Sequence, residues 1–278
     1  METFDAEWLR LREPVDHRAR AVPLLAPLCD AWRTAGWSRV LDLGSGTGSN
    51  LRYLAPRLPA GQEWVLVDHD RDHLRALARV GAPPAVRRLT VVSGDLAREG
   101  LASIARADLV TASALLDLVS ADWLGRLVDA CAANGLGAHF ALNYDGQIGW
   151  SDEGGQPGYG AEDPDDALVR EAVNVHQTGD KGLGPALGPA AWQVAVRLFE
   201  ATGCRTLLLP SPWRLTAADA EIARRLIDGW AAAAAEVRPA DTSRIRAWAS
   251  RRWATVAGGA FTLTVGHRDL VALPLPRS

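Results

Sequence analysis

Residues 40–50, with the sequence VLDLGSGTGSN, place an acidic residue inside an apolar segment directly before three alternating glycines. Gly44, Gly46 and Gly48 lack a Cβ, so the backbone can turn with positive φ and come close to a ligand. The dinucleotide-binding pattern GxGxxG opens a helix that faces a pyrophosphate. Here the glycines alternate and Asp42 stands two residues before the first. Because a carboxylate suits a cation better than a phosphate, the run predicts a nucleoside-cofactor loop; an ordinary strand–turn–helix is the alternative.

Strand and helix patterns alternate on both sides of this loop, which predicts a parallel sheet with right-handed crossovers. Residues 1–36 are expected to form one or two helices, with a break at Pro14 and a C-cap at Gly36. Strands are expected at 39–43, 63–67, 89–92, 107–112 and 138–142, and helices at 49–58, 71–80 and 121–133. Ligands of such sheets bind beyond the carboxyl ends of the strands.

The second half of the chain departs from this rhythm between residues 143 and 189. That segment is rich in glycine and proline, carries an acidic run at 162–166 and has one helical pattern, at 167–175. It is too long for an ordinary connection, so it is interpreted as a lid, with a plain surface excursion as the alternative. A helix at 190–202, a strand at 205–209, helices at 217–237 and 242–256 and a last strand at 261–265, continuing through 270–273, are expected to follow.

We therefore predict one domain over residues 1–278. It comprises an N-terminal helical cap (1–36), a cofactor-binding core (37–145), a lid-like insertion (146–189) and the C-terminal part of the sheet (190–278), which contains a helical insertion at 216–257. The arginines at 244, 246, 251 and 252, with Trp248 and Trp253 between them, are interpreted as a solvated helix face with two packed aromatics.

The composition of the chain argues against several classes of binding partner. The formal net charge of −3 lacks the basic footprint of nucleic-acid binders. No apolar stretch approaches the ~20 residues of a membrane span, and residues 1–12 do not resemble a secretory signal, so a cytoplasmic protein without membrane contact is expected. The three cysteines are far apart and lack CxxC spacing, which argues against a disulfide framework or a zinc site. We expect no bound metal and either a monomer or a homodimer.

Acidic residues recur at the ends of the first three predicted strands: Asp42 in the first, Asp68 after the second and Asp95 after the third. Parallel strands bring these ends to one edge of the sheet. Each acid alone has an alternative as a turn or N-cap residue. Together they would repel one another unless they served separate hydrogen-bond donors or cations, and a nucleoside with an amino-acid tail offers three.

The run at 40–50 and the acids that follow resemble the motifs of class I S-adenosylmethionine-dependent methyltransferases. The resemblance covers residues 39–142 well and the strands at 205–209 and 261–265 loosely. It implies an α/β, three-layer Rossmann-like sheet that is mostly parallel with an antiparallel last strand, flanked by N-terminal helices and inserted cap or lid segments. It also implies S-adenosylmethionine as cofactor and S-adenosylhomocysteine as product.

The same resemblance implies how the cofactor is held. Asp42 takes part in binding the methionine moiety, Asp68 binds the ribose hydroxyls, with Asp70 as the alternative, and Asp95 binds the adenine amino group while the next backbone N–H meets the ring. An N-terminal arginine, Arg20 or alternatively Arg18, is expected to bind the carboxylate. The cofactor-binding residues predicted in this way are Arg20, Asp42, Gly44, Ser45, Gly46, Gly48, Asp68, His69, Asp95, Leu96 and Ser113.

The segment after the fourth strand, Ser113 to Asp117, corresponds in this family to the part that passes beside the reactive methyl group. It lacks the Asn/Asp-Pro-Pro-Tyr-type motif of enzymes that methylate nucleic-acid bases or protein glutamine. Methyl transfer requires alignment, exclusion of water and, for a hydroxyl or ammonium acceptor, removal of a proton. The predicted proton acceptors are His176, Asp117 and Asp145, and the predicted substrate-binding residues are Asp117, Asn143, Tyr144, His176, Gln177, Lys181 and Trp213.

Alternatives for these residues are an N-cap for Asp117, a surface histidine for His176, a turn for Asn143 and Tyr144, and core packing for Trp213. The sequence thus predicts methyl transfer to a small or medium-sized molecule, on oxygen or nitrogen rather than carbon or sulfur. Two other functions compete with it: an NAD-dependent oxidoreductase, which shares the sheet, and a protein that binds S-adenosylmethionine without transferring its methyl group. The sequence does not identify the acceptor.

Overall fold

One sheet organises residues 5–151 and 163–275, the parts of the chain that the computed structural model describes. Residues 1–4 of the predicted cap and 152–162 of the predicted lid lie outside them. The strand order is β3-β2-β1-β4-β5-β8-β6, and β7 pairs with β8. The strands are β1 (Arg39–Leu43), β2 (Gln62–Asp68), β3 (Val86–Ser93), β4 (Leu109–Ser113), β5 (Gly137–Ser151), β6 (Arg205–Pro210), β7 (Trp213–Leu215) and β8 (Thr262–Leu273).

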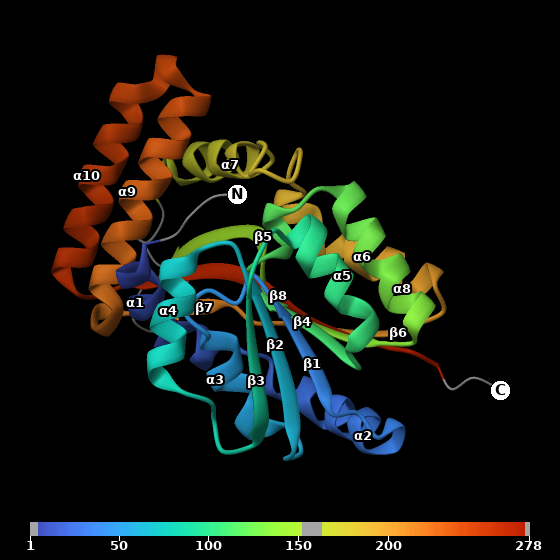
Figure 1. Cartoon of the computed structure of the whole chain (residues 1–278). Helices are drawn as coiled ribbons and strands as arrows, with labels where there is room; N and C mark the ends of the chain where they lie inside the picture. The colour runs from blue at the N-terminus through green and yellow to red at the C-terminus, as the bar shows by residue number, and fades with distance from the viewer. Residues whose placement is uncertain (1–4, 152–162, 276–278) are drawn as a thin grey trace.

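Pairing is parallel from β3 through β5, and β8 runs antiparallel to β5, β6 and β7. Helices cover both faces of this sheet, so the layers are helix, sheet and helix (Figure 1). The predicted Rossmann-like sheet with antiparallel strands at its C-terminal side is confirmed. The α-helices are α1 (Ala6–Ala19), α2 (Leu25–Ala35), α3 (Ser49–Leu54), α4 (Arg71–Val80), α5 (Leu101–Ser103), α6 (Ala121–Asn134), α7 (Asp166–His176), α8 (Ala191–Ala201), α9 (Ala220–Val237) and α10 (Thr242–Gly258).

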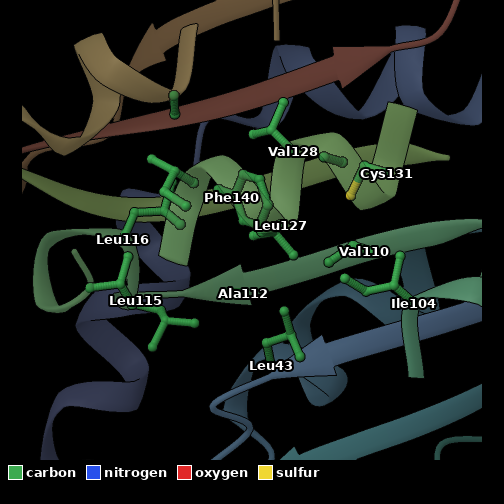
Figure 2. Close-up of a cluster of buried hydrophobic side chains, with 14 of the residues drawn as sticks. Leu43, Ile104, Val110, Ala112, Leu115, Leu116, Leu127, Val128, Cys131 and Phe140 are labelled. Carbon is green, nitrogen blue, oxygen red and sulfur yellow. The ribbon is translucent and has the colours of Figure 1, made fainter. Parts of the chain in front are cut away.

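The two faces of β1 show how the sequence builds these layers. Because successive side chains of a strand point to opposite faces, Leu41 and Leu43 join the core beneath α5, α6 and α8, whereas Val40 joins the core beneath α2 and α3. Figure 2 shows the first core, in which Leu43, Val110 and Phe140 from three strands meet side chains of α6. Asp42 points to the same face of the sheet as Val40 and is buried there.

A third core lies between α1, α7, α9 and α10 and the outer parts of β5, β7 and β8 (Figure 1). Trp248 of α10 and Ile227 of α9 are buried in it. This group of helices stands over one end of the sheet and encloses space above it. None of the described helices is long and apolar enough to cross a membrane.

The interpretation of the α10 arginines as a solvated face holds for three of them, since Arg244, Arg246 and Arg251 are exposed, but not for Arg252. Of the two tryptophans predicted to be packed, Trp248 is buried and Trp253 is 44% exposed. Arg252 is only 2% exposed, forms an ion pair with Asp166 and lies 4.4 Å above the ring of Trp150. Arg251 bridges the carboxylates of Asp163 and Asp165, at 2.5 and 2.7 Å. The acidic run therefore neutralises this basic helix and fixes the start of α7 to it, which the sequence could not show because the two segments are some 80 residues apart.

Two elements differ from their predicted bounds. Helix α1 continues through Pro14, where a break was expected, because its next turn buries Val15 and Asp16 against the third core and outweighs one lost backbone hydrogen bond. Strand β5 was expected to end at residue 142 but extends to Ser151, with irregular register between Phe140 and Asn143 and between Tyr144 and Ile148. Its pairing with β8 carries the strand into the region predicted as a lid. Other elements lie close to their predicted positions, and Gly36 caps α2 with φ 65° as expected.

Candidate functional site

A cavity of about 100 Å³ lies over the glycine loop and the carboxyl ends of β1, β2 and β4; we call it the loop cavity. Each strand supplies lining residues directly after its last hydrogen-bonded residue, as expected for a parallel sheet. Among the predicted cofactor-binding residues, the ones that line it are Gly44, Ser45, Gly46, Asp68, His69 and Ser113. Residues predicted from three separate strands are therefore brought together at one place.

The glycine loop is shaped by backbone conformations that other residues rarely adopt. Gly44, Gly46 and Gly48 have φ values of 65°, 50° and 85°. The Gly46 N–H donates a 2.7 Å hydrogen bond to Asp68, which ties the loop to the end of β2. A Cβ at Gly48 would overlap the side chain of Leu77. Gly48 does not line the cavity. Because it lacks a Cβ, the first turn of α3 can approach α4.

Asp42 is buried directly behind the loop cavity and does not line it. One carboxylate oxygen accepts a 2.8 Å hydrogen bond from Asn50 Nδ2, and Asn50 itself faces the cavity. The other oxygen, Oδ2, has no hydrogen-bond partner. Burial raises the pKa of Asp42 from 3.8 to about 7, against the lowering effects of the Asn50 hydrogen bond and the Arg20 charge. A positive ligand charge in the cavity would reverse this shift.

Arg20 does not reach the loop cavity, so the structure does not support it as the group that meets the cofactor carboxylate. Its guanidinium is 5% exposed, donates a 3.0 Å hydrogen bond to Asn50 Oδ1 and lies 3.6 Å from Asp269. Arg18, the alternative, is exposed and pairs with Asp219 at 2.7 Å. Arg18 and Arg20 come after the turn of α1 that buries Val15 and Asp16, and the chain leads away from the cavity there.

Arg12, about two turns before Arg20 on α1, is the arginine at the cavity wall. Arg12 donates to Asp16 at 2.9 and 3.2 Å, and both residues line the loop cavity. Asp16 also accepts a 3.1 Å hydrogen bond from Trp213 Nε1. The i,i+4 spacing of Arg12 and Asp16 was visible in the sequence, but only the docking of α1 onto β7 shows which of its arginines faces the cavity.

Asp95 and Leu96 lie outside the loop cavity. Asp95 is exposed and caps the following π-helical turn by accepting a 2.6 Å hydrogen bond from the Ala97 N–H, while its own N–H donates to Glu99. Leu96 is 1% exposed within the core beneath α6. Asp95 thus acts as an N-cap in this structure, which was the alternative interpretation. Its exposed carboxylate and the neighbouring backbone remain open to a ligand.

A second, larger cavity of about 510 Å³ adjoins the first and lies among α1, α7, α9 and the ends of β5, β7 and β8; we call it the helical cavity. Arg12, Ala114 and Leu118 line both cavities. Ala114 and Leu142, which both line the helical cavity, have positive φ values of 53° and 55°. Positive φ in non-glycine residues is a form of strain that collects at functional sites. Because the two cavities share three lining residues, a reactive group in one cavity could meet a molecule in the other.

The helical cavity contains most of the predicted substrate-binding residues: Asp117, Tyr144, His176, Gln177, Lys181 and Trp213. Tyr144 donates a 2.8 Å hydrogen bond to Asn174, and burial raises its pKa, so its hydroxyl stays protonated. His176 Nε2 lies 3.2 Å from Glu236 at the end of α9. Apolar and aromatic side chains, among them Trp8 and Trp230, make up much of the remaining wall.

Asn143, which was predicted to bind the substrate, and Asp145, which was predicted to accept its proton, do not line the helical cavity. Neighbouring residues of a strand point to opposite faces, and Tyr144 between them takes the cavity side. Asn143 is 1% exposed and donates hydrogen bonds to two carbonyl oxygens, of Phe140 and Arg268, at the irregular pairing of β5. Asp145 pairs with Arg268 at 3.1 Å and lines a separate hollow.

Sequence reasoning missed His267 of β8, which lines the helical cavity and is 6% exposed. Burial and the nearby Arg12 charge lower its pKa to about 3, so the ring is neutral. No motif marks this residue. Its place follows from the antiparallel pairing that sets it opposite Tyr144. Within the described residues, no group of three or more His, Cys, Asp or Glu side chains is arranged to hold a metal ion.

Comparison with known proteins adds a family match over part of the chain. Residues 40–134 match the model of a methyltransferase domain. No curated protein sequence matches the chain. A cyclopropane-fatty-acyl-phospholipid synthase-like protein from Lactobacillus casei has a similar structure, with a TM-score of 0.53, 15% identity and coverage of 95% of this chain and 92% of that one. A methyltransferase from Geobacter sulfurreducens, solved with S-adenosyl-L-homocysteine, has a TM-score of 0.43 at 14% identity, covering 98% and 99% of the two chains.

The matched segment begins inside β1 and ends with α6, so it contains the glycine loop, Asp42, Asp68 and the strand that leads to Ala114. These are the elements that build the loop cavity and the edge that it shares with the helical cavity. Residues 40–134 thus carry a match to a methyltransferase domain, set within a Rossmann-like sheet of the methyltransferase type.

Proposed function

We propose that this enzyme transfers the methyl group of S-adenosylmethionine to a hydroxyl or amino group of a small or medium-sized molecule bound in the helical cavity. The observation that carries the proposal is the adjoining of two unlike cavities, one over the glycine loop and one walled largely by apolar and aromatic side chains, which share Arg12, Ala114 and Leu118. A cavity of about 510 Å³ lies in the range that binds drug-sized ligands.

Several groups at the loop cavity fit the cofactor. Asp42 Oδ2 and Ser45 Oγ are buried without hydrogen-bond partners, as are both ring nitrogens of His69. Such groups are costly unless a ligand satisfies them. We assign Asp68 and His69 to the ribose hydroxyls, Asn50 and Asp42 to the ammonium group, and Arg12 to the carboxylate. Asp95 remains our assignment for the adenine amino group through its exposed carboxylate.

The bound cofactor supplies an electrophilic methyl group on a sulfonium. The protein then has to hold the acceptor in line with it, exclude water and receive the proton that a hydroxyl or amine loses. Ala114 and Leu118 belong to the shared edge, and Ser113 and Leu115 line the loop cavity beside it. The two leucines help to exclude water there. The apolar wall of the helical cavity serves the same purpose.

Asp117 is our candidate for the proton acceptor. It is 8% exposed, lines the helical cavity and precedes Leu118, a residue of the shared edge. His176 lies in the last turn of α7, where Glu236 engages its Nε2, and we assign it to binding at the far end of the acceptor. Asp145 has no part in this proposal because it lies outside the cavity.

The test is to incubate the enzyme with an extract of small metabolites and S-adenosylmethionine that carries a deuterated methyl group, and to search for labelled products by mass spectrometry. The Asp117→Asn variant is expected to bind S-adenosylhomocysteine normally while product formation falls by roughly 10²-fold or more. Gly125→Ala, a substitution into open space on α6, serves as the matched control. Absence of labelled small molecules, with cofactor bound, would favour the alternative of a protein that binds the cofactor and transfers nothing.

A further inference from the structure

The orientation of His267 in the helical cavity is set by its strand and by two neighbouring rings. It lies on β8, opposite Tyr144 of β5 in the strand register. Its ring centroid is 5.2 Å from the ring of Trp213 and 6.2 Å from that of Tyr144. Aromatic rings at such separations pack favourably and restrict rotation of the imidazole. The ring is thus held in one plane on the cavity wall.

One hydrogen bond decides which nitrogen of His267 carries the proton. Nδ1 lies 3.0 Å from the carbonyl oxygen of Val265, and a carbonyl can only accept. Nδ1 is therefore the donor. In a neutral ring the other nitrogen, Nε2, then offers only a lone pair, and among the described residues no side chain hydrogen-bonds to it. Burial keeps the ring neutral at physiological pH, reinforced by the positive charge of Arg12 on α1.

The position of His267 relates it to the reaction. Arg12 lines both cavities, and its guanidinium lies 5.0 Å from the centroid of the Trp213 ring. Trp213 in turn contacts His267. The three side chains therefore form a chain of contacts that begins at Arg12, on the shared edge of the two cavities. This chain of contacts connects His267 to the edge where the two cavities meet.

Aromatic side chains from four elements wall the same cavity: Trp8 of α1, Tyr144 of β5, Trp213 of β7 and Trp230 of α9. Such walls favour a flat, apolar ligand, because planar rings stack on one another and bury a large area. His267 is part of the same wall, and the Nε2 lone pair of its neutral ring can accept a hydrogen bond from an N–H or O–H group. The wall and the lone pair together select for a planar ring that carries a neutral hydrogen-bond donor.

We propose that His267 is a specificity-determining residue of the acceptor site, and that its Nε2 accepts a hydrogen bond from the hydroxyl or amino group of a planar aromatic methyl acceptor. This inference rests on the proposed function, since it assumes that the helical cavity holds the acceptor. It narrows the acceptor class from small molecules in general to neutral phenol-like or aniline-like compounds. Fully substituted amines and carboxylates are excluded at this position, because neither offers a neutral donor.

The test compares two probes that differ in one donor, 2-naphthol and 2-fluoronaphthalene, by equilibrium dialysis in the presence of S-adenosylhomocysteine. We expect the wild type to bind 2-naphthol at least about fivefold more tightly, the size of one net hydrogen bond. The His267→Asn variant keeps an N–H near the place of Nδ1 for Val265 but has no counterpart of Nε2, and it should lose this preference. His267→Phe, which has no hydrogen-bond acceptor, is the second variant, in case the first folds poorly.

Calorimetry with S-adenosylhomocysteine accompanies each variant, and its affinity should not change. The inference is overturned if the wild type binds the two probes equally, if neither probe binds, or if the preference for 2-naphthol persists in both variants. Failure of the proposed function gives a different pattern. In that case 2-naphthol is preferred through His267 in the wild type, but no labelled methylated product forms from any hydroxy or amino compound.

Discussion

The raised pKa of Asp42 predicts that cofactor binding and proton release are coupled. In the free protein burial raises this pKa to about 7, so close to half of the Asp42 side chains are protonated at pH 7. A ligand ammonium group near Asn50 favours the ionised carboxylate and lowers this pKa. Binding must therefore expel the proton wherever it is present, and this costs affinity below pH 7.

The size of the effect follows from the titration of a single site. About ten in eleven molecules carry the proton at pH 6 and about one in eleven at pH 8, so the association constant for S-adenosylhomocysteine should rise roughly tenfold between these values. At pH 7 about half a proton should be released per ligand bound. The direction is fixed by the sign of the shift, since a group that binds its proton more tightly in the free state favours that state at low pH.

Isothermal calorimetry measures both quantities. Titrations at pH 6, 7 and 8 give the affinity, and repeating the pH 7 titration in buffers of different ionisation enthalpy gives the number of protons released. Asp42→Asn is the matched control, because it keeps the side chain's size and removes the titration. The reasoning is refuted if Asp42→Asn retains the same pH dependence, or if the wild type binds more tightly at pH 6 than at pH 8.

Three further outcomes are expected. Gly48→Ala should destabilise the fold by more than about 1 kcal/mol in urea denaturation, because φ is +85° and the new Cβ overlaps Leu77, whereas Gly125→Ala, in open space on α6, should stabilise it by about 0.5–1 kcal/mol. The pKa of His267 is about 3 in the folded protein and ~6.5 in the unfolded chain, so the free energy of unfolding should fall by roughly 1.4 kcal/mol per pH unit as the pH drops from 6 toward 4. The His267→Phe variant should lack this contribution when the free energy of unfolding is measured against pH. Arg252→Ala should cost about 3–5 kcal/mol by leaving Asp166 and Trp150 without their buried partner, while the exposed Arg246→Ala should change the free energy of unfolding by less than about 0.5 kcal/mol.

Equal stability of Gly48→Ala and Gly125→Ala would contradict the role of the close contact between α3 and α4. An unchanged acid slope in His267→Phe would show that this histidine titrates normally in the fold. A cost for Arg252→Ala no larger than that for Arg246→Ala would mean that the ion pairs between α10 and the start of α7 contribute nothing to stability.

The order of strands and helices and the place of the loop cavity could be predicted because they depend on local patterns. Alternating strands and helices force parallel pairing, and parallel strands bring their carboxyl ends to one edge. Asp68 was expected at this edge for that reason and Ser113 from the family resemblance, and both line the loop cavity. The strand-end argument also placed Asp42 at this edge. In the structure Asp42 lies behind the cavity surface, because Asn50 covers the strand face to which it points.

The parts of the site that depend on distant pairings could not be predicted. The orientation of Asn143, Tyr144 and Asp145 depends on the irregular register between β5 and β8, and a shift of one residue would have exchanged the buried and cavity-facing sides. Arg12 faces the cavity only because α1 docks on β7. His267 reaches the site from the last strand, through an antiparallel pairing for which the local sequence carries no signal.

The proposed reaction requires the cofactor's reactive sulfur to stand at the edge shared by the two cavities. A crystal structure of the enzyme with S-adenosylhomocysteine would test this requirement. The expectation is a ligand over Gly44 and Gly46, with its sulfur beside Ala114 and Leu118 and open toward the helical cavity. It is contradicted if the ligand binds elsewhere, or if its sulfur is walled off from the space lined by Tyr144, Trp213 and His267.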